Sequence, residues 1–486
     1  MADATNTVLS ALNLIDGALQ PAAGGEWLEG VEPATGQPWG RVASSDARDV
    51  ERAVAAAKAA APAWAALPAA ARGRHLRALA RLVERDLEAL AAAESQDTGK
   101  PIHVARTVDL PRAVQNLDFF ADAATQFSSE CHPAPDALHY TLRAPLGVVA
   151  CISPWNLPLY LLTWKLAPAL AAGNAVVAKP SEVTPLTAAM FGALAVEAGL
   201  PRGVLNLLMG TGPRAGAPLC AHPDVKAISF TGSTRVGGEL ALGAARSFKK
   251  VSLEMGGKNA TVVFEGADLE LAAAEAVRGA FSNQGQICLC GSRILVERTI
   301  YPAFKERLLA RVRALRVGDP RDPGTDQGAL TSQAHLEKVL GCLATARAEG
   351  AQVLCGGERV RVPGRCAEGY FVAPTLLEGL GPETRTNQEE IFGPVATLQP
   401  FDGEEDALRL ANATRYGLAA SVFTRDLARA HRVAGLLRAG IVWVNCWMLR
   451  DLRTPFGGVG DSGVGREGGW EAMRFFTEPK SVTVKL

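Results

Sequence analysis

Cys288 is the residue of this chain whose surroundings point most directly to chemistry. It lies in the segment Phe281-Ser-Asn-Gln-Gly-Gln-Ile-Cys-Leu-Cys290, between a predicted helix over residues 271–280 and a predicted strand over residues 293–296. Small and amide side chains surround the thiol, so that a ligand can approach it closely. A cysteine in such a turn can act as a nucleophile if its thiolate is favoured, although most cysteines are small buried packing residues.

Glu254 supplies the second half of the same chemistry. This carboxylate stands beside two glycines in Leu253-Glu-Met-Gly-Gly-Lys258, which taken alone reads as a turn. A Cys nucleophile and a Glu base are the two groups needed to form a thioester and then hydrolyse it. We therefore ask which elements would bring the two residues together.

Short apolar runs alternate with helical stretches from about residue 146 onward. The predicted strands of the first region cover residues 147–153, 175–179, 204–209 and 227–230, and a second alternating region between residues 259 and 445 includes strands at 261–264, 293–296, 419–423 and 441–444. Such alternation predicts an α/β fold with two doubly wound parallel-sheet domains.

The remaining segments frame these two regions. Residues 1–45 are rich in turn-forming residues and we expect them to be irregular, whereas residues 46–99 and 103–127 show helical spacing of apolar residues. Residues 130–142 are polar, and the C-terminal residues 480–486 alternate strictly, as a half-exposed strand does. The last two segments predict a small β flap for oligomerisation.

Two short motifs follow predicted strands and suit a dinucleotide. Gly232 and Ser233 belong to Thr231-Gly-Ser-Thr-Arg-Val-Gly237, whose backbone amides at a helix start can face a diphosphate. Lys179-Pro-Ser-Glu182 closes another strand, where Lys179 and Glu182 can reach ribose hydroxyls. A carboxylate there would repel a 2′-phosphate, which favours NAD over NADP; a solvated charge pair beside a helix start is the alternative.

The bulk composition excludes several classes of partner. The 486 residues carry 50 Lys+Arg and 50 Asp+Glu, so nothing favours nucleic acid or a charged membrane. The nine cysteines are scattered and the seven histidines form no ligand cluster, which indicates reduced thiols in a cytoplasmic protein and no metal site. Neither a signal peptide nor a membrane-spanning segment is expected.

Seven motifs in order resemble the aldehyde dehydrogenase superfamily along nearly the full chain. They are Pro154-Trp-Asn-Leu-Pro158, Lys179-Pro-Ser-Glu182, Phe230-Thr-Gly-Ser-Thr234, Leu253-Glu-Met-Gly-Gly-Lys258, the stretch around Cys288, Glu389-Glu-Ile-Phe-Gly-Pro394 and Pro455-Phe-Gly-Gly458. The resemblance implies that fold, a homodimer or homotetramer, and three domains. These are an NAD-binding domain (1–129 and 143–255), a catalytic domain (256–452) and bridging strands (130–142 and 478–486).

The resemblance also implies roles for individual residues. Cys288 would attack the aldehyde carbon, Asn156 would donate to the oxyanion, and Glu254 would activate the water that hydrolyses the thioester. The implied NAD contacts are Trp155, Lys179, Ser181, Glu182, Gly232, Ser233, Glu390 and Phe392. Lys165 and Glu467 could relay protons or form a structural ion pair, and Cys290 is expected to be a packing residue.

Two segments narrow the substrate. Residues 443–450 and 475–478 are similar to those of the branch that oxidises 2-aminomuconic 6-semialdehyde or 2-hydroxymuconic semialdehyde, two substrates that the sequence does not separate. Arg450, close before Pro455, and Arg106 are expected to face a tunnel and to bind a substrate carboxylate. The alternatives are a surface ion pair for each arginine, a broad-specificity aldehyde dehydrogenase, CoA-acylating or esterase chemistry on the same fold, and a non-catalytic scaffold.

Overall fold

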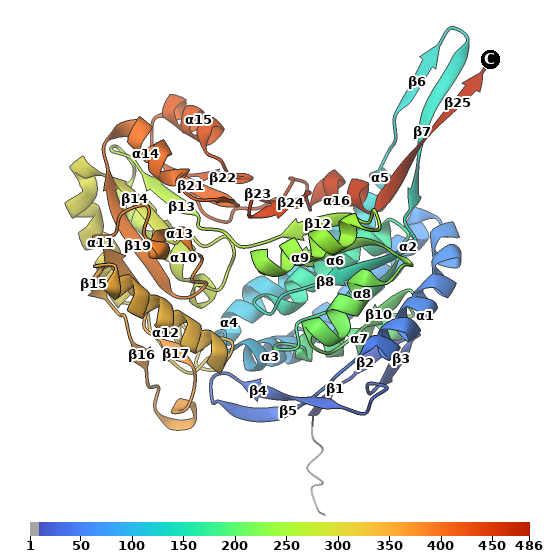
Figure 1. Cartoon of the computed structure of the whole chain (residues 1–486), viewed down its shortest axis with the longest axis horizontal. Helices are drawn as coiled ribbons and strands as arrows, with labels where there is room; N and C mark the ends of the chain where they lie inside the picture. The colour runs from blue at the N-terminus through green and yellow to red at the C-terminus, as the bar shows by residue number, and fades with distance from the viewer. Residues whose placement is uncertain (1–8) are drawn as a thin grey trace, which may run out of the picture.

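A computed structural model describes residues 9–486 and contains two large sheets with helices on their faces (Figure 1). The first sheet has eight strands, in the order β24 (Gly463–Val464), β12 (Lys250–Glu254), β11 (Val225–Thr231), β8 (Val148–Ile152), β9 (Ala175–Lys179), β10 (Leu205–Leu207), β2 (Asn13–Ile15) and β3 (Ala18–Gln20). The five strands from β12 to β10 run parallel to one another, and β24 and β2 add antiparallel strands at either side of them. Every residue of β8 and β9 is buried, as their continuous apolar sequences require.

The second sheet has seven strands, in the order β15 (Gln352–Cys355), β18 (Thr375–Glu378), β19 (Val395–Phe401), β14 (Arg293–Glu297), β13 (Ala260–Val263), β21 (Ala419–Phe423) and β22 (Ile441–Val444). All neighbours are parallel except β15 and β18. The predicted α/β class with two parallel sheets is therefore confirmed.

The helices that bear on the site come from both halves of the chain and accompany both sheets. In the first half of the chain they are α1 (Ala47–Ala66), α2 (Ala69–Arg85), α3 (Leu87–Thr98), α5 (Leu110–Gln126), α6 (Pro158–Ala171), α7 (Leu186–Glu197) and α9 (Thr234–Ala245). In the second half they are α10 (Leu269–Phe281), α11 (Tyr301–Arg313) and α12 (Gln333–Ala348). All residues of α6 are buried, so this helix forms the centre of the first core.

One short π-helix, η1 (Ala105–Asp109), interrupts the predicted helix over residues 103–127. It lies between the three-residue α4 (Ile102–Val104) and α5. A π-helix turns each residue through a smaller angle than an α-helix does, so it changes which side chains of the following helix face the core, and such turns are frequent at functional sites.

A three-stranded antiparallel sheet projects from the body of the molecule (Figure 1). It pairs β6 (Cys131–Ala134) with β7 (Ala137–Pro145) and β7 with the C-terminal β25 (Thr477–Lys485). Residues 130–142 and the C-terminal strand thus form the small β flap that the sequence predicts, and its role in oligomerisation stays a prediction. The division into NAD-binding, catalytic and bridging domains stays a prediction.

The expectation of an irregular segment before residue 46 was wrong for the residues that the structure describes there. β1 (Leu9–Ala11), β5 (Gln37–Ala43) and β4 (Trp27–Glu32) form a small sheet, and β2 and β3 extend the first large sheet. β1 and β3 have three residues each, and β4, with six, shows no alternation of buried and exposed side chains, so these strands carry little periodic signal. Residues 1–8 lie outside the described part of the chain.

No single helix of residues 9–486 is both long enough and apolar enough to cross a membrane. Taken together, α1 and α2 have the required length and apolarity, but a bend of 119° separates them.

Candidate active site

Cys288 follows a turn that only an unusual backbone can make. α10 ends at Phe281, and Asn283 (φ 51°), Gln284 (φ 56°) and Gly285 (φ 68°) then adopt left-handed conformations in succession. A Cβ at Gly285 would clash with the carbonyl oxygen of Gly393. The close approach of these two segments of the chain therefore requires glycine at position 285. Non-glycine residues in this region cost energy and cluster at functional sites.

The Cys288 thiol is half-buried and held in place from behind. The Asn259 side chain donates from Nδ2 to the carbonyl oxygens of Cys288 (2.7 Å) and Cys290 (3.0 Å). Burial raises the pKa of the Cys288 thiol, and the carboxyl groups of Glu390 and Glu254 raise it further. At neutral pH the thiol is therefore protonated and needs a base to become a nucleophile.

Glu254 ends β12 and its carboxyl group has no partner. Both oxygens are buried, and neither accepts a hydrogen bond from any described residue. Gly457 (φ 150°) makes room for the side chain, because a Cβ there would lie 2.6 Å from Glu254 Oε1. Burial raises the pKa of Glu254 well above its ordinary value, and the nearby Glu467 adds to the effect. A carboxyl group with a raised pKa beside a protonated thiol is suited to act as a base.

Lys165 and Glu467 form a buried pair next to Glu254. Lys165 Nζ donates to Glu467 Oε1 at 2.6 Å and to Ser229 Oγ at 3.1 Å, and the Ser229 hydroxyl also donates to Glu467 Oε1. Glu467 Oε2 is buried and without a partner among the described residues. The geometry is compatible with both predicted roles, a proton relay and an ion pair that holds the fold.

Asn156 lies in the loop between β8 and α6, on the other side of the thiol-bearing turn. Its side-chain Nδ2 donates to the carbonyl oxygen of Gln286 at 2.8 Å, and its backbone oxygen accepts from Asn283 Nδ2 at 3.1 Å. These bonds tie the Asn156 loop to the Cys288 turn. An amide nitrogen has two N–H groups, so Asn156 can still donate to an oxyanion formed at the cysteine.

A cavity of about 240 Å³ brings most of the predicted site residues together. Its lining includes the predicted Trp155, Asn156, Gly232, Ser233, Cys288, Glu390 and Phe392, and also His335 and Lys338, which the sequence analysis did not identify. Both additional residues lie on α12, far along the chain from any of the seven motifs, and no local pattern marks them.

Ring packing and hydrogen bonds hold the side chains that line this cavity. The Trp155 ring packs edge-on against Phe392 (centroids 5.2 Å apart) and against His335 (5.0 Å), and Phe392 itself has a left-handed backbone (φ 62°). Glu390 accepts a hydrogen bond from the Gly257 backbone at 3.0 Å, while burial raises the pKa of its carboxyl group to about 7. The Ser233 side chain caps α9 by accepting from the Val236 backbone.

Lys179, Ser181 and Glu182 lie outside the lining of this cavity, at the carboxyl end of β9. Lys179 Nζ donates to Glu182 (3.1 Å) and to two backbone carbonyl groups, those of Pro180 and Gly210. The Glu182 carboxylate remains half-exposed, and Ser181 Oγ accepts from the Val183 backbone. A ribose would meet this group at the end of a parallel strand.

Arg106 does not lie with the other candidates. Its guanidinium donates to both oxygens of Glu88 at 2.8–3.0 Å, and its side chain is 41% exposed. The expectation that Arg106 shares a tunnel with Arg450 is therefore corrected. The surface ion pair, named above as the alternative, is what the structure contains.

Arg112, six residues further on in α5, lies next to Arg450 instead. The Arg450 guanidinium donates to the Tyr160 hydroxyl at 2.8 Å and stacks over the Phe456 ring at 4.2 Å. Arg112 lies 5.7 Å from the Tyr160 ring, and its Nε and Nη2 atoms are buried without a partner among residues 9–486. Burial lowers the pKa of Arg112, the positive charge of Arg450 contributes, and the Tyr160 hydroxyl and the negative charge of Asp451 act in the opposite direction. Two guanidinium groups and a phenol thus converge, and neither guanidinium forms a direct ion pair with an acid of residues 9–486.

The comparisons with known proteins agree on one family. The model of the aldehyde dehydrogenase family matches residues 20–482. A 2-aminomuconic semialdehyde dehydrogenase of Danio rerio is 50% identical over 477 residues, 97% of this chain and 98% of that protein. A 2-hydroxymuconic semialdehyde dehydrogenase of Pseudomonas sp. (strain CF600) is 46% identical over 481 residues, 98% of this chain and 99% of that protein. Among solved structures, a mutant of the P. syringae indole-3-acetaldehyde dehydrogenase in complex with NAD+ has a TM-score of 0.96 at 40% identity, and the match covers 99% of this chain and 98% of that chain.

Proposed function

Because this chain belongs to the aldehyde dehydrogenase family, we propose that it oxidises a semialdehyde bearing a carboxylate to the corresponding acid, with NAD as cofactor. The substrate class follows the relatives named for 2-aminomuconic and 2-hydroxymuconic semialdehydes. The observation that carries the proposal is the pair Arg112 and Arg450, whose guanidinium groups meet around Tyr160, where two buried donor atoms of Arg112 have no partner among the described residues.

Arg112 and Arg450 form no direct ion pair with an acid of the described residues, because nearby Asp451 pairs with Arg453, and two such arginines favour an anionic ligand. Guanidinium groups bind a carboxylate through paired N–H donors, and they do so more strongly in a partly dry site than at a surface. Arg112 cannot be neutralised by losing a proton at physiological pH, so its unpaired Nε and Nη2 atoms favour an anionic ligand. A semialdehyde with a carboxylate at the end remote from the aldehyde fits this requirement.

The residues around the 240 Å³ cavity fit NAD. The capped N-terminus of α9 at Ser233 can receive a diphosphate, and the buried Glu390 can accept from ribose hydroxyl groups. Lys179 and Glu182 are placed for the second ribose. When bound, NAD accepts the hydride that the aldehyde carbon releases.

The chain's own residues carry the remaining steps. Cys288 gives its proton to solvent as its sulfur forms a bond to the aldehyde carbon. Asn156 Nδ2 and the Cys288 backbone N–H stabilise the oxyanion of this adduct. After the carbon is oxidised to a thioester, Glu254 takes a proton from water, the hydroxide adds to the carbonyl, and the thiolate leaves with the acid as product.

Assembly and location are further parts of the proposal. The projecting sheet of β6, β7 and β25 presents strand edges, which favour pairing with another copy in a homodimer or homotetramer. The scattered cysteines, all free in the part of the chain that the structure describes, favour a cytoplasmic protein.

The proposed function is tested by following NADH absorbance with a panel of aldehydes. We expect kcat/KM to be highest for 2-aminomuconic or 2-hydroxymuconic semialdehyde and much lower for hexanal and benzaldehyde. Equal values across the panel would replace the proposal with a broad-specificity enzyme. Thioester formation that requires CoA would indicate acylating chemistry, and no NADH with any aldehyde would indicate a scaffold.

A further inference from the structure

Lys100 is a fully buried cation that the chemistry described above does not use. It follows α3 in the chain, and its side chain has no exposed surface. Its ammonium group donates to Asp109 Oδ2 in a short contact and to the backbone carbonyl oxygen of Asn156 at 3.1 Å, and it lies 3.6 Å from Glu94 Oε1. A charge buried this deeply persists only when it is paired and hydrogen-bonded.

The Asn156 contact gives this cluster a direction. The Asn156 carbonyl oxygen accepts two hydrogen bonds, one from Lys100 Nζ and one from Asn283 Nδ2, both at 3.1 Å. A carbonyl oxygen has two lone pairs, so both are in use. Two donors from different segments fix the plane of the peptide bond that follows Asn156, and with it the direction in which the Asn156 side chain leaves the backbone.

Asp109 and Glu94 hold the ammonium from the side away from the loop. Asp109 is the last residue of η1, and Glu94 lies on α3, where Thr187 Oγ1 donates to its Oε2 at 2.8 Å. Both carboxyl groups are buried. The ammonium is thus anchored in two helical segments and reaches across to a loop that carries a predicted oxyanion donor.

We propose that Lys100 is a positioning residue for the reaction, because it holds the Asn156 backbone so that the side-chain amide faces the oxyanion formed at Cys288. The inference rests on the proposed function in one respect, the role of Asn156 as oxyanion donor. Removing an oxyanion donor slows acyl chemistry about 10²–10³-fold, and misplacing a catalytic group by ~1 Å can cost about 10²-fold.

A double-mutant cycle separates positioning from a purely structural ion pair. The readouts are the NADH burst with hexanal and the nitrophenol burst with p-nitrophenyl acetate, because neither substrate has a carboxylate for Arg112 and Arg450. We expect Lys100→Met and Asn156→Ala each to slow both bursts about 10²-fold, and the double variant to be no slower than Asn156→Ala alone. The NAD affinity of Lys100→Met should stay within about twofold of the original.

Three outcomes would overturn the inference. One is a wild-type burst in folded Lys100→Met. Another is a double variant slowed by the product of the two single effects, since a structural pair acts independently of Asn156. If Asn156→Ala itself leaves both bursts unchanged, the oxyanion role in the proposed function fails first, and this result is distinguishable from the other two.

Lys249→Met is the matched control. Lys249 Nζ donates to two backbone carbonyl oxygens, those of Cys220 (2.6 Å) and His222 (2.7 Å), and neither of these residues lines the 240 Å³ cavity, whereas Asn156, the backbone partner of Lys100, does. We expect its burst rates to be unchanged. If Lys100→Met does not fold, Asp109→Asn provides the decision, because it keeps the shape and weakens the anchor. It should slow both bursts about tenfold, and have no effect in the Asn156→Ala background. Unchanged bursts in folded Asp109→Asn would reject the inference.

Discussion

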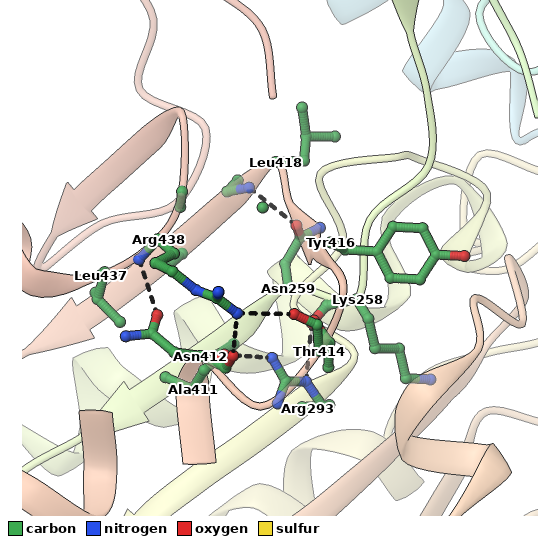
Figure 2. A pocket seen from close by; sticks show the side chains of 15 residues that line it. Lys258, Asn259, Arg293, Ala411, Asn412, Thr414, Tyr416, Leu418, Leu437 and Arg438 are labelled. Carbon is green, nitrogen blue, oxygen red and sulfur yellow. Dashed lines mark hydrogen bonds between the residues drawn. The ribbon is translucent and has the colours of Figure 1, made fainter. Parts of the chain in front are cut away.

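Two arginines of this chain with buried guanidinium nitrogens have opposite surroundings. Arg293 lines a small cavity of about 20 Å³, drawn in Figure 2, and all its donor atoms are used. Its Nε, Nη1 and Nη2 donate at 2.7–2.8 Å to the carbonyl oxygens of Lys258, Leu410 and Ala411. Arg112 has buried Nε and Nη2 atoms with no partner in the described chain.

The difference separates stability from binding. A buried polar group is normally hydrogen-bonded, and an unpaired one costs roughly 1–3 kcal/mol of stability. Arg293 ties β14 to the end of a helix and leaves no room for a ligand. Arg112, like the unpaired carboxyl group of Glu254, lowers stability in the free protein, and such a cost is expected where a substrate or a reaction step supplies the missing partner.

The largest effect should come from Glu254→Gln. An amide cannot accept the proton of the attacking water, so steady-state turnover should fall about 10²–10⁴-fold. Mass spectrometry after one turnover should find an acyl adduct on Cys288. Normal turnover in this variant would remove Glu254 from the hydrolysis step, and an inactive enzyme without an adduct would place Glu254 before the thioester.

Arg293→Met tests the other side of the comparison. The substitution removes hydrogen bonds to three carbonyl oxygens, of which that of Leu410 keeps a donor in the Ala413 backbone, so we expect a loss of about 3 kcal/mol in unfolding free energy, measured as a lower urea midpoint. Substrate selectivity at a temperature where the variant is folded should stay unchanged. Arg298→Met is the control, because Arg298 makes an exposed pair with Asp402 that contributes at most about 1 kcal/mol.

The cofactor preference should be a smaller effect. Because Glu182 is proposed to bind a ribose, NAD should be preferred over NADP by about tenfold or more in kcat/KM, and each tenfold corresponds to about 1.4 kcal/mol. Glu182→Gln should reduce this preference. The prediction is refuted by equal kcat/KM values for the two cofactors in the unaltered protein.

The smallest effect should be a gain in stability. The folded-state pKa of Glu254 is raised above its unfolded value, so the native state holds the proton more tightly, and stability falls as pH rises from the unfolded pKa through the folded pKa. Gln does not ionise. At pH 8 the unfolding free energy of Glu254→Gln should therefore exceed that of the original protein by about 1 kcal/mol or more, which is measured as a higher melting temperature. This difference should shrink toward pH 5. A difference independent of pH would mean that Glu254 ionisation does not affect stability.

The parts of this structure that the sequence predicted share a strong local signal. Strands such as β8 and β9 are continuous apolar runs, and the glycine-containing motifs mark turns that other residues cannot make. Seven such motifs in order carry the resemblance to the aldehyde dehydrogenase superfamily. The match of the family model to residues 20–482 confirms it.

Features that depend on long-range packing were missed. His335 and Lys338 reach the cavity from α12. The N-terminal strands β1 and β3 have too few residues to show an alternating pattern in the sequence. The sequence points to Arg106 and does not identify Arg112, because it does not reveal the π-helix over residues 105–109 or the pairing of Arg106 with Glu88. Helix spacing alone does not decide which of two arginines faces the interior.

The central claim is that Arg112 and Arg450 select a carboxylate, and one measurement tests it most directly. The ratio of kcat/KM for 2-hydroxymuconic semialdehyde to that for hexanal is determined in the original protein, in Arg112→Ala and Arg450→Ala, and in Arg106→Ala as the surface control. Truncating one side of a desolvated charge pair costs about 2 kcal/mol or more. Arg112→Ala and Arg450→Ala should therefore each lower this ratio about thirtyfold or more, mostly by raising KM for the semialdehyde. Arg106→Ala should leave the ratio unchanged. Equal fractional losses on both aldehydes in Arg112→Ala and Arg450→Ala would contradict the claim.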